Sequence, residues 1–483
     1  MSMKFSNPIY QNEELTYEDV FIFQQYFEGK SRIHDVDITP KNKLNTTLPI
    51  ISANMNAVTG KRMAETLARY GWIWVLPQDM EIEKMIEIIH FVKNANINFD
   101  TPLTVKKNEY VRDALSIINK RAHKCVILVD EEHKPLSIFT PSDLDKYEQF
   151  TQLWNINKSR LITWNEDITP EEAYNLMHQK WISALPIVNN TGKLIWILTK
   201  KDAVRRWLYT PTLDKNAKLN ICIALWINSF LEKAKKLIDV WVDTFILDTA
   251  HGYQKTMIDA IKNFRQEFWN EICLIAWNVS TPEATKALIE AGADWVKVWI
   301  GPGAMCTTRM MTGVGRPQFS AVYHCAKAAK WLWGFVIADW GIKEPRDLAL
   351  ATAAGASHIM MGSILTGTFE STGDIFYDAE WNMYKQNYWM ASWRAVLLRN
   401  SKLSEFEQAK KALFQEWIST SKIYLRDWYK SVWDVVDKFT TGLRSSLTYV
   451  WAKTLEDFNE KVIIWVQTPA GFVEGTPHGK VKK

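Results

Sequence analysis

The stretch WVKVWIGPGAMCTTRMMTGVGRPQ, residues 295–318, combines an apolar run with a glycine-rich loop. The apolar run is typical of a buried strand. The two glycines around a proline that follow it predict a loop whose backbone can approach a ligand closely. Cys306 lies in this loop among small hydroxyl residues and near an arginine. It is a candidate nucleophile, because the thiolate is the reactive form and nearby positive charge favours it; the alternative is a buried cysteine in a turn.

Seven further apolar runs alternate with helical patterns along the chain. The eight candidate strands are 48–55, 72–77, 219–226, 244–250, 272–279, 295–301, 335–340 and 358–363. Helical stretches separate them, among them 60–70, 232–238, 281–291, 319–329 and 345–354. Eight strands alternating with helices predict an α/β fold, the TIM (β/α)8 barrel, in which active sites lie at the C-terminal ends of the strands.

Two similar units interrupt the barrel pattern, at 101–150 and 157–208. Each runs from a polar turn into a helix, two strands and a Thr-x-x-Asp motif that opens another helix. The members of the motif are Thr140 with Asp143 and Thr199 with Asp202. Threonine and aspartate are common helix caps, so the motif alone leaves both a cap and a ligand site open.

Composition limits the classes of partner and compartment. The chain has 483 residues, enough for two or three domains, and a net charge of only +4, which gives no indication of nucleic acid or membrane as a partner. Five scattered cysteines suit a reducing cytosol and no disulfide framework. The N-terminus lacks the apolar core of a signal peptide, and no run approaches ~20 apolar residues. We therefore expect a cytoplasmic protein.

The loop GPGAMCTTRMMTGVGRPQ, 301–318, resembles the catalytic loop of the IMP dehydrogenase/GMP reductase family. In that family the loop cysteine attacks C2 of the purine nucleotide and forms a covalent thioimidate. The Met-Met and Arg-Pro-Gln-Phe-Ser variant is similar to GMP reductases that carry a CBS-domain pair. The resemblance covers nearly the whole chain. It implies a TIM barrel at 1–98 and 211–483, a tandem CBS (Bateman) module at 99–210 with units at about 99–150 and 157–210, and a flap and C-terminal segment within 381–483.

The same resemblance implies a set of site residues. For catalysis it implies Cys306, Thr308 and Glu370, the glutamate relaying a proton through the threonine to the leaving amine. For the substrate, two phosphate loops, a ribose-holding aspartate and a flap tyrosine match Asp339, Trp340, Gly341, Gly362, Ser363 and Tyr388. For the dinucleotide it implies Asp248, Thr249, Ala250, Asn278, Trp299, Ile300 and Gly301. Backbone carbonyls of Gly301, Gly303 and Cys306 match a monovalent-cation (potassium) site.

The implied reaction is the NADPH-dependent reductive deamination of GMP to IMP and ammonia, a step of purine salvage. An IMP dehydrogenase that oxidises IMP to XMP with NAD is the alternative. Ala304, where dehydrogenases usually have a phosphate-binding serine, and the lack of an Arg-Tyr dipeptide between Trp381 and Gly442 favour the reductase. A third possibility is an inactive nucleotide-sensing paralogue. The family also implies an adenine or guanine nucleotide at the CBS pair and a homotetramer or octamer.

Tryptophan is over-represented in this chain, with 24 tryptophans against 20 glycines. Several tryptophans stand where the family pattern has glycine: Trp72, Trp74, Trp226, Trp277, Trp299, Trp340, Trp389, Trp451 and Trp465. Drift would not choose one replacement for one residue type. We therefore hypothesise that the source organism reads UGA as glycine and that the written sequence translates it as tryptophan. A degenerate, inactive paralogue is the alternative.

Overall fold

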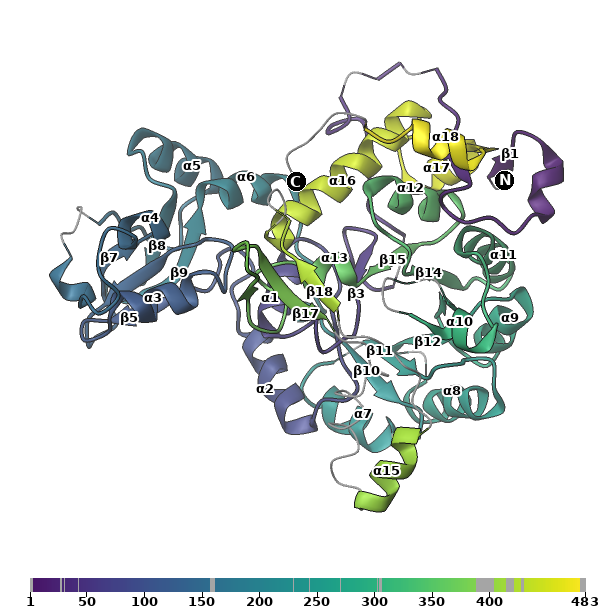
Figure 1. Ribbon diagram of the computed structural model, residues 1–483, viewed down its shortest axis with the longest axis horizontal. Coiled ribbons are helices and arrows are strands. Elements are labelled where there is room, and N and C mark those ends of the chain that lie inside the picture. The colour runs from purple at the N-terminus through teal and green to yellow at the C-terminus, as the bar shows by residue number, and fades with distance from the viewer. Residues whose placement is uncertain are drawn as a thin grey trace.

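The computed structural model describes residues 3–477 except 27, 30, 42, 157–160, 229, 243, 270, 302, 304, 305, 388–403, 414–420 and 427–429. Eight parallel strands form one sheet in the order β3-β15-β14-β13-β12-β11-β10-β4 (Figure 1). Their bounds are β3 Ile50–Ser52, β4 Val75–Leu76, β10 Cys222–Trp226, β11 Thr244–Asp248, β12 Cys273–Val279, β13 Trp295–Val298, β14 Phe335–Asp339 and β15 His358–Met361. All eight predicted barrel strands are confirmed.

The two edge strands of this sheet lie close to each other. A parallel bridge joins Ile51 of β3 to Ile73, just before β4, and the Ser52 N–H donates a hydrogen bond of 3.1 Å to the Ile73 carbonyl. The sheet is therefore a nearly closed barrel, which agrees with the predicted TIM fold.

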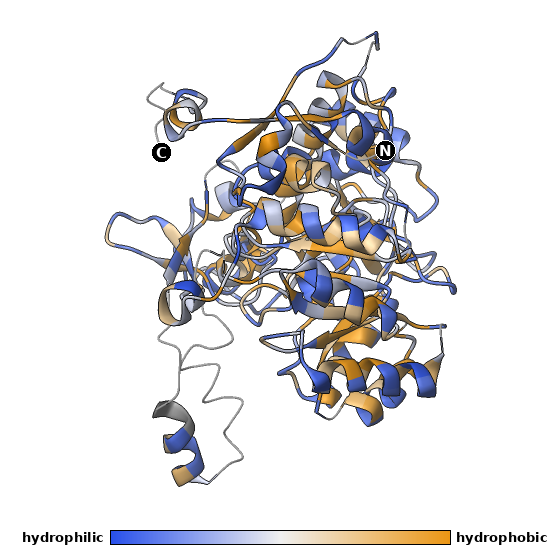
Figure 2. Cartoon of the chain, turned by 90° about the vertical axis from the view of Figure 1, so that its right-hand side faces the viewer, coloured by the Kyte–Doolittle hydropathy of each residue, from blue (hydrophilic) through white to orange (hydrophobic). Residues whose placement is uncertain are grey.

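Helices surround the barrel and follow its strands. They are α1 Lys61–Arg69, α2 Ile82–Lys93, α7 Phe230–Ile238, α8 Lys255–Phe268, α9 Pro282–Glu290, α11 Gln318–Lys330 and α12 Pro345–Ala353, with short helices α10 Thr308–Thr312 and α13 Ser363–Thr366. Figure 2 shows apolar residues concentrated in the central strands and hydrophilic residues on outward sides of the helices. Among helices in the described part of the chain, none has both the length and the hydropathy needed to cross a bilayer.

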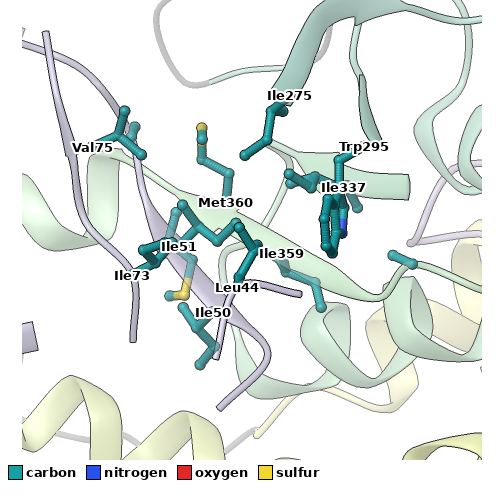
Figure 3. Packing of buried hydrophobic residues seen from close by; sticks show 14 of the residues in the cluster. Leu44, Ile50, Ile51, Ile73, Val75, Ile275, Trp295, Ile337, Ile359 and Met360 are labelled. Atoms are coloured by element: carbon teal, nitrogen blue, oxygen red, sulfur yellow. The ribbon is translucent and has the colours of Figure 1, made fainter. Parts of the chain in front are cut away.

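The barrel strands are apolar because both faces of a parallel barrel are covered, the outer face by helices and the inner face by side chains. Ile51, Ile275, Ile337 and Ile359, from four different strands, are fully buried and lie together in the core shown in Figure 3. One charged residue, Lys297, is also fully buried on β13, so it needs a partner at the site described below.

An inserted lobe, residues 99–210, extends from one side of the barrel (Figure 1). Its first unit contains β5 Thr104–Lys106, α3 Val111–Ile118, β6 Val126–Val129, β7 Pro135–Phe139 and α4 Pro141–Leu144. Its second contains α5 Pro170–Gln179, β8 Ala184–Val188, β9 Leu194–Thr199 and α6 Lys200–Leu208. Helix, antiparallel strand pair and helix recur in both, as the repeat predicts. Its identity as a CBS module and its exact boundaries stay predictions.

Both Thr-x-x-Asp motifs cap a helix. The Thr140 hydroxyl donates to the Asp143 carboxylate at 2.6 Å, at the start of α4. Thr199 donates likewise to Asp202, whose own N–H donates back to the Thr199 hydroxyl at 3.1 Å at the start of α6. The capping alternative therefore accounts for the local geometry of both motifs.

The two ends of the chain meet beside the barrel. Strands β1 Lys4–Phe5, β19 Ile463–Val466 and β2 Val20–Ile22 form one small sheet. Helices α16 Val432–Tyr449, α17 Leu455–Lys461 and α18 Pro469–Glu474 belong to the same end, and α16 packs on α12. Strands β16 Phe376–Tyr377, β17 Met383–Asn387 and β18 Ser421–Tyr424 form a second small sheet, and α15 spans Glu405–Leu413. Two 3-10 turns lie at Pro8–Asn12 and Leu153–Asn155.

Many tryptophans have positive φ angles, which are typical of glycine. In the described part of the chain, eleven non-glycine residues have positive φ, and seven are tryptophan: Trp181, Trp241, Trp269, Trp333, Trp340, Trp381 and Trp451. A residue with a Cβ is strained by roughly 1–2 kcal/mol in this region, whereas glycine is not. This concentration at one residue type supports the hypothesis that UGA is read as glycine.

Two neighbouring tryptophans after α11 test that interpretation. Trp333 has φ of 57° and Trp331 has φ of −68°, and both side chains are largely exposed, at 93% and 79%. We expect Trp333→Gly to raise the free energy of unfolding by about 0.5–1 kcal/mol, because the strain is relieved and little buried area is lost. Trp331→Gly should lower it by about 0.5–1 kcal/mol. Urea unfolding of both variants measures this, and equal shifts would contradict it.

Candidate active site

The predicted nucleophile lies in the loop between β13 and α11. Cys306 is half-buried, and its Sγ donates to the Thr308 hydroxyl oxygen at 3.2 Å. The other four cysteines are buried. Burial raises the pKa of the Cys325 thiol to about 12, and the same cause raises the pKa of the Cys125 thiol. Cys306 is therefore the cysteine that a substrate can approach.

Glycines allow the loop to fold around Arg309. Gly301 has φ of +105°, and a Cβ added there would overlap the Arg309 side chain. A Cβ at Gly315 would come within 2.6 Å of Arg309 Cγ. Any larger residue would displace the arginine, so the two glycines are required by close approach and, at Gly301, also by backbone conformation.

The C-terminal end of the loop is tied to the barrel. The Arg316 guanidinium forms an ion pair of 2.6 Å with Glu14. The Gln318 side-chain amide donates hydrogen bonds of 2.8 Å to the carbonyls of Val298 and Asp339. These contacts join the ends of β13 and β14, so the loop that carries Cys306 is tied to the barrel at its C-terminal end.

Asp339, the predicted ribose ligand, ends β14 and is almost fully buried. Its carboxylate is paired with the ammonium of Lys297 on β13. Burial lowers the pKa of Lys297 to about 8, against the opposing effect of Asp339, and burial raises the pKa of Asp339. Sequence reasoning missed Lys297, although a lysine alternating with apolar residues inside a strand was an available signal.

Asp248, a predicted cofactor residue, ends β11 and belongs to a buried polar cluster. The Asn54 amide donates to its carboxylate at 3.2 Å and to the Gln78 side-chain oxygen at 2.8 Å, and the Gln78 amide also donates to Asp248. Asn54 and Gln78 follow β3 and β4. Sequence analysis assigned neither, although each polar residue directly follows an apolar run. Burial raises the pKa of Asp248 to about 7, although Lys297 opposes the shift.

The pKa of Asp248 predicts a pH dependence of stability. The folded state keeps this proton to about pH 7, whereas the unfolded chain releases it near its ordinary pKa of 3.8. The contribution of this proton to the free energy of unfolding is thus fully present below about pH 4 and is lost as pH rises through 7. The free energy of unfolding falls by at most about 1.4 kcal/mol per pH unit in this range. Asp248→Asn should remove this slope. Urea unfolding across that range measures it, with the half-exposed Asp259→Asn as control; parallel profiles for wild type and Asp248→Asn would contradict it.

The remaining predicted cofactor residues lie on adjoining strand ends. Asn278 of β12 is buried, and its side-chain Oδ1 has no hydrogen-bond partner in the described part of the chain. The Gly252 N–H donates to its main-chain carbonyl at 2.7 Å. After β11, Thr249 is half-buried and Ala250 exposed. After β13, Trp299 is buried, Ile300 half-buried and Gly301 buried. A buried amide oxygen without a donor suits an amide-bearing ligand.

The predicted phosphate loops follow β14 and β15. Trp340 and Gly341 both have positive φ, 68° and 81°. Gly362 precedes α13, which begins at Ser363. Tyr388 lies outside the described residues.

Two indoles fill the space beside the catalytic loop. Trp340 is buried, and its ring lies 6.0 Å from that of Trp299. A Cβ at Gly303 would come within 2.7 Å of the Trp340 ring. Hydrogen bonds from the side chain and backbone of Trp340 also reach the Asp339 carboxylate. The Trp340 indole therefore lies between the Asp339 carboxylate and the backbone of the catalytic loop, with the Trp299 ring beside it.

Glu370, the predicted proton relay, is held at the start of α16. It is buried, and its carboxylate accepts hydrogen bonds of 2.9 Å from the Ser431 hydroxyl and from the Val432 N–H. These donors form the N-terminus of α16, which favours a carboxylate through its unpaired N–H groups. Burial raises the pKa of Glu370. The carboxylate thus caps α16, and its role as a proton relay through Thr308 stays a prediction.

No group of three or more His, Cys, Asp or Glu side chains within the described residues could hold a metal ion. The predicted potassium site rests on backbone carbonyls of Gly301, Gly303 and Cys306, so it stays a prediction.

Comparison with known proteins places the whole chain in one family. A family model described as the IMP dehydrogenase/GMP reductase domain matches residues 14–478. A GMP reductase of Mycobacterium tuberculosis is 43% identical over 465 residues, covering 96% of both chains. An inosine-5'-monophosphate dehydrogenase of Aquifex aeolicus is 37% identical over 478 residues, covering 96% of this chain and 95% of that protein.

Solved structures agree with this assignment. A cysteine-to-alanine variant of GMP reductase from Trypanosoma brucei, in complex with guanosine 5'-monophosphate, matches with a TM-score of 0.69 and 29% identity. The match covers 97% of this chain and 98% of that one. The same enzyme in complex with guanosine 5'-triphosphate matches with a TM-score of 0.58 and 27% identity, covering 94% and 98%.

Proposed function

The chain belongs to the IMP dehydrogenase/GMP reductase family of oxidoreductases, and we propose that it is a GMP reductase. The reaction is the reductive deamination of GMP to IMP and ammonia with NADPH. The higher identity to GMP reductases than to the dehydrogenase supports this choice, as does the likeness to a GMP-bound reductase. The observation that carries the proposal is Cys306, half-buried beside Thr308 in a glycine loop at the C-terminal end of β13.

Cys306 is the proposed nucleophile. Its Sγ forms a bond to C2 of GMP, and the exocyclic amine leaves that carbon as ammonia. The leaving amine needs a proton, which Glu370 supplies through the Thr308 hydroxyl. Glu370 caps α16 in this structure, so the proposal includes a tightening of the catalytic loop around bound GMP, as is common for catalytic hydrogen bonds. The C–Sγ bond breaks when C2 is reduced, and IMP leaves.

The substrate is held at the ends of β14 and β15. Asp339, oriented by Lys297, accepts hydrogen bonds from the ribose hydroxyls. The backbone N–H groups of residues 340–341 and 362–363 bind the phosphate, since glycine turns at the ends of barrel strands 7 and 8 commonly do so. Tyr388 is the proposed flap tyrosine that helps to hold the phosphate.

The strand ends next to Cys306 fit a nicotinamide cofactor. The unpartnered Oδ1 of Asn278 accepts from a carboxamide, and Asp248 accepts from a ribose hydroxyl. Thr249, Ala250, Trp299, Ile300 and Gly301 complete this side of the site. When bound, NADPH supplies a hydride to C2. A potassium ion on the carbonyls of Gly301, Gly303 and Cys306 is part of the same proposal.

The inserted lobe is the proposed CBS module, which binds an adenine or guanine nucleotide. The proposed assembly is a homotetramer or octamer.

A second candidate function follows from the indoles beside Cys306. If Trp340 and Trp299 are native, they fill the nucleotide position, and the chain would be a nucleotide-sensing protein without turnover.

One assay separates these functions. The protein is made with glycine at each tryptophan that stands where the family pattern has glycine; we call these positions the family-glycine tryptophans. It is then given GMP with NADPH or, in parallel, IMP with NAD. We expect NADPH oxidation that depends on GMP, with IMP and ammonia formed in equal amounts. NADH formation from IMP would instead identify a dehydrogenase, and lack of turnover in both mixtures would favour the sensing protein.

A further inference from the structure

The inserted lobe contacts the barrel around the capping site of Glu370. The guanidinium of Arg205, on α6 of the lobe, forms ion pairs with Asp437 at 2.6 Å and Asp434 at 3.2 Å, both on α16. The Tyr209 hydroxyl also donates to Asp437 at 2.9 Å. Arg205 is buried although it is charged, and it is held by these two carboxylates together with Asp202 of its own helix, at 3.3 Å. Figure 1 shows α6 and α16 side by side.

The same helix holds the predicted proton relay. α16 begins at Val432, whose N–H donates to Glu370, and its N-cap Ser431 donates to the other carboxylate oxygen, both at 2.9 Å. Asp434 and Asp437 lie on the first two turns of this helix. Because a helical turn moves as one unit, a clamp on these aspartates also fixes the N–H group that holds Glu370.

A second lobe residue reaches the residue next to Glu370. The ammonium of Lys124 lies 5.1 Å from the centre of the Phe369 ring. A cavity of about 1040 Å³ opens beside these contacts, lined by lobe residues such as Lys124 and by α16 residues such as Asp434. The junction is thus partly open, and discrete polar contacts hold the lobe against the start of α16.

We propose that Arg205 is a positioning residue for Glu370, acting through the first turns of α16. The inference rests on the proposed function, because it gives Glu370 its role as proton donor. A carboxylate that transfers a proton must be held in one orientation by neighbours that are themselves held. Docking of the lobe then fixes the orientation of the Glu370 carboxylate. If the lobe moves away, that orientation is held less tightly.

A double-mutant cycle on the full chain, made with glycine at the family-glycine tryptophans, tests the pathway. Arg205→Ala should lower kcat about tenfold and leave KM for GMP unchanged, and Arg205→Lys should restore part of the loss. In a Glu370→Gln background, Arg205→Ala should have no further effect, because both changes act on one group. Arg206→Ala, the adjacent arginine, which bonds Ile97 and Asn98 instead of α16, should leave kcat unchanged.

If the effects of Arg205→Ala and Glu370→Gln on kcat multiplied in the double variant, the proposal would be overturned, because the arginine would then act on a different group. Hydrogen exchange of residues 431–437 gives a readout that does not need turnover. Faster exchange in Arg205→Ala, but not in Arg206→Ala, supports the clamp, and unchanged exchange in both overturns it. Lack of GMP turnover by the protein that has glycine at the family-glycine tryptophans and no other substitution would reject the proposed function, while the exchange comparison would still decide the clamp.

Discussion

Cys306→Ala is expected to lower GMP-dependent NADPH oxidation by roughly 10⁵-fold or more, because the covalent bond to C2 cannot form without the thiolate. Binding of GMP should change by no more than a few-fold, since alanine occupies less space and the groups proposed to hold the ribose and phosphate follow other strands. Steady-state kinetics and calorimetric titration with GMP, both on protein with glycine at the family-glycine tryptophans, measure the two effects.

The chain offers a matched control for this prediction. Cys273 begins β12, so it lies at the end of the barrel opposite the site, and it is buried. Cys273→Ala should retain nearly full turnover. A thiol-alkylating reagent should modify Cys306 first, and GMP should protect it. If Cys306→Ala turned over GMP within tenfold of the parent protein with glycine at the family-glycine tryptophans, no thioimidate would be needed.

Local patterns were sufficient to predict the barrel and to single out Cys306 as a candidate nucleophile. The eight strands are continuous apolar runs, which a barrel buried on both faces requires. The loop around Cys306 carries its glycines at fixed spacing, so its conformation is set mainly by residues within 301–318. Asp248 and Asp339 end β11 and β14, and their predicted roles came from the family resemblance.

Contacts between segments distant in sequence could not be predicted in this way. Glu370 is held by Ser431 and Val432, more than sixty residues later, and no local pattern indicates which helix a buried carboxylate will cap. Lys297 pairs with Asp339 across two neighbouring strands. The pairing of Asn54 and Gln78 with Asp248 depends likewise on barrel closure, which brings β3 and β4 to the side of the barrel that holds β11.

Trp340→Gly is expected to convert a filled site into a nucleotide-binding one. The Trp340 ring lies against Gly303 and donates to Asp339, so glycine frees both the loop backbone and the carboxylate that we propose binds the ribose. Hydrogen bonds to charged groups contribute about 1.5–3 kcal/mol each. Two recovered phosphate contacts would therefore tighten GMP binding by about 10²- to 10⁴-fold, measured by calorimetry on chains that differ only at this position.

The distant variant Trp333→Gly separates a local effect of glycine from a general one. It removes an exposed indole after α11, so it should change stability without changing GMP affinity. Adding Trp299→Gly to Trp340→Gly should tighten GMP binding further, because the two rings lie 6.0 Å apart in the same space.

Peptide masses of the protein from its own organism show whether these positions are tryptophan or glycine in the native protein. Glycine at 340 and 333 would establish that UGA is read as glycine. Tryptophan at both would mean that the organism keeps the site filled, and the sensing function would replace the reductase.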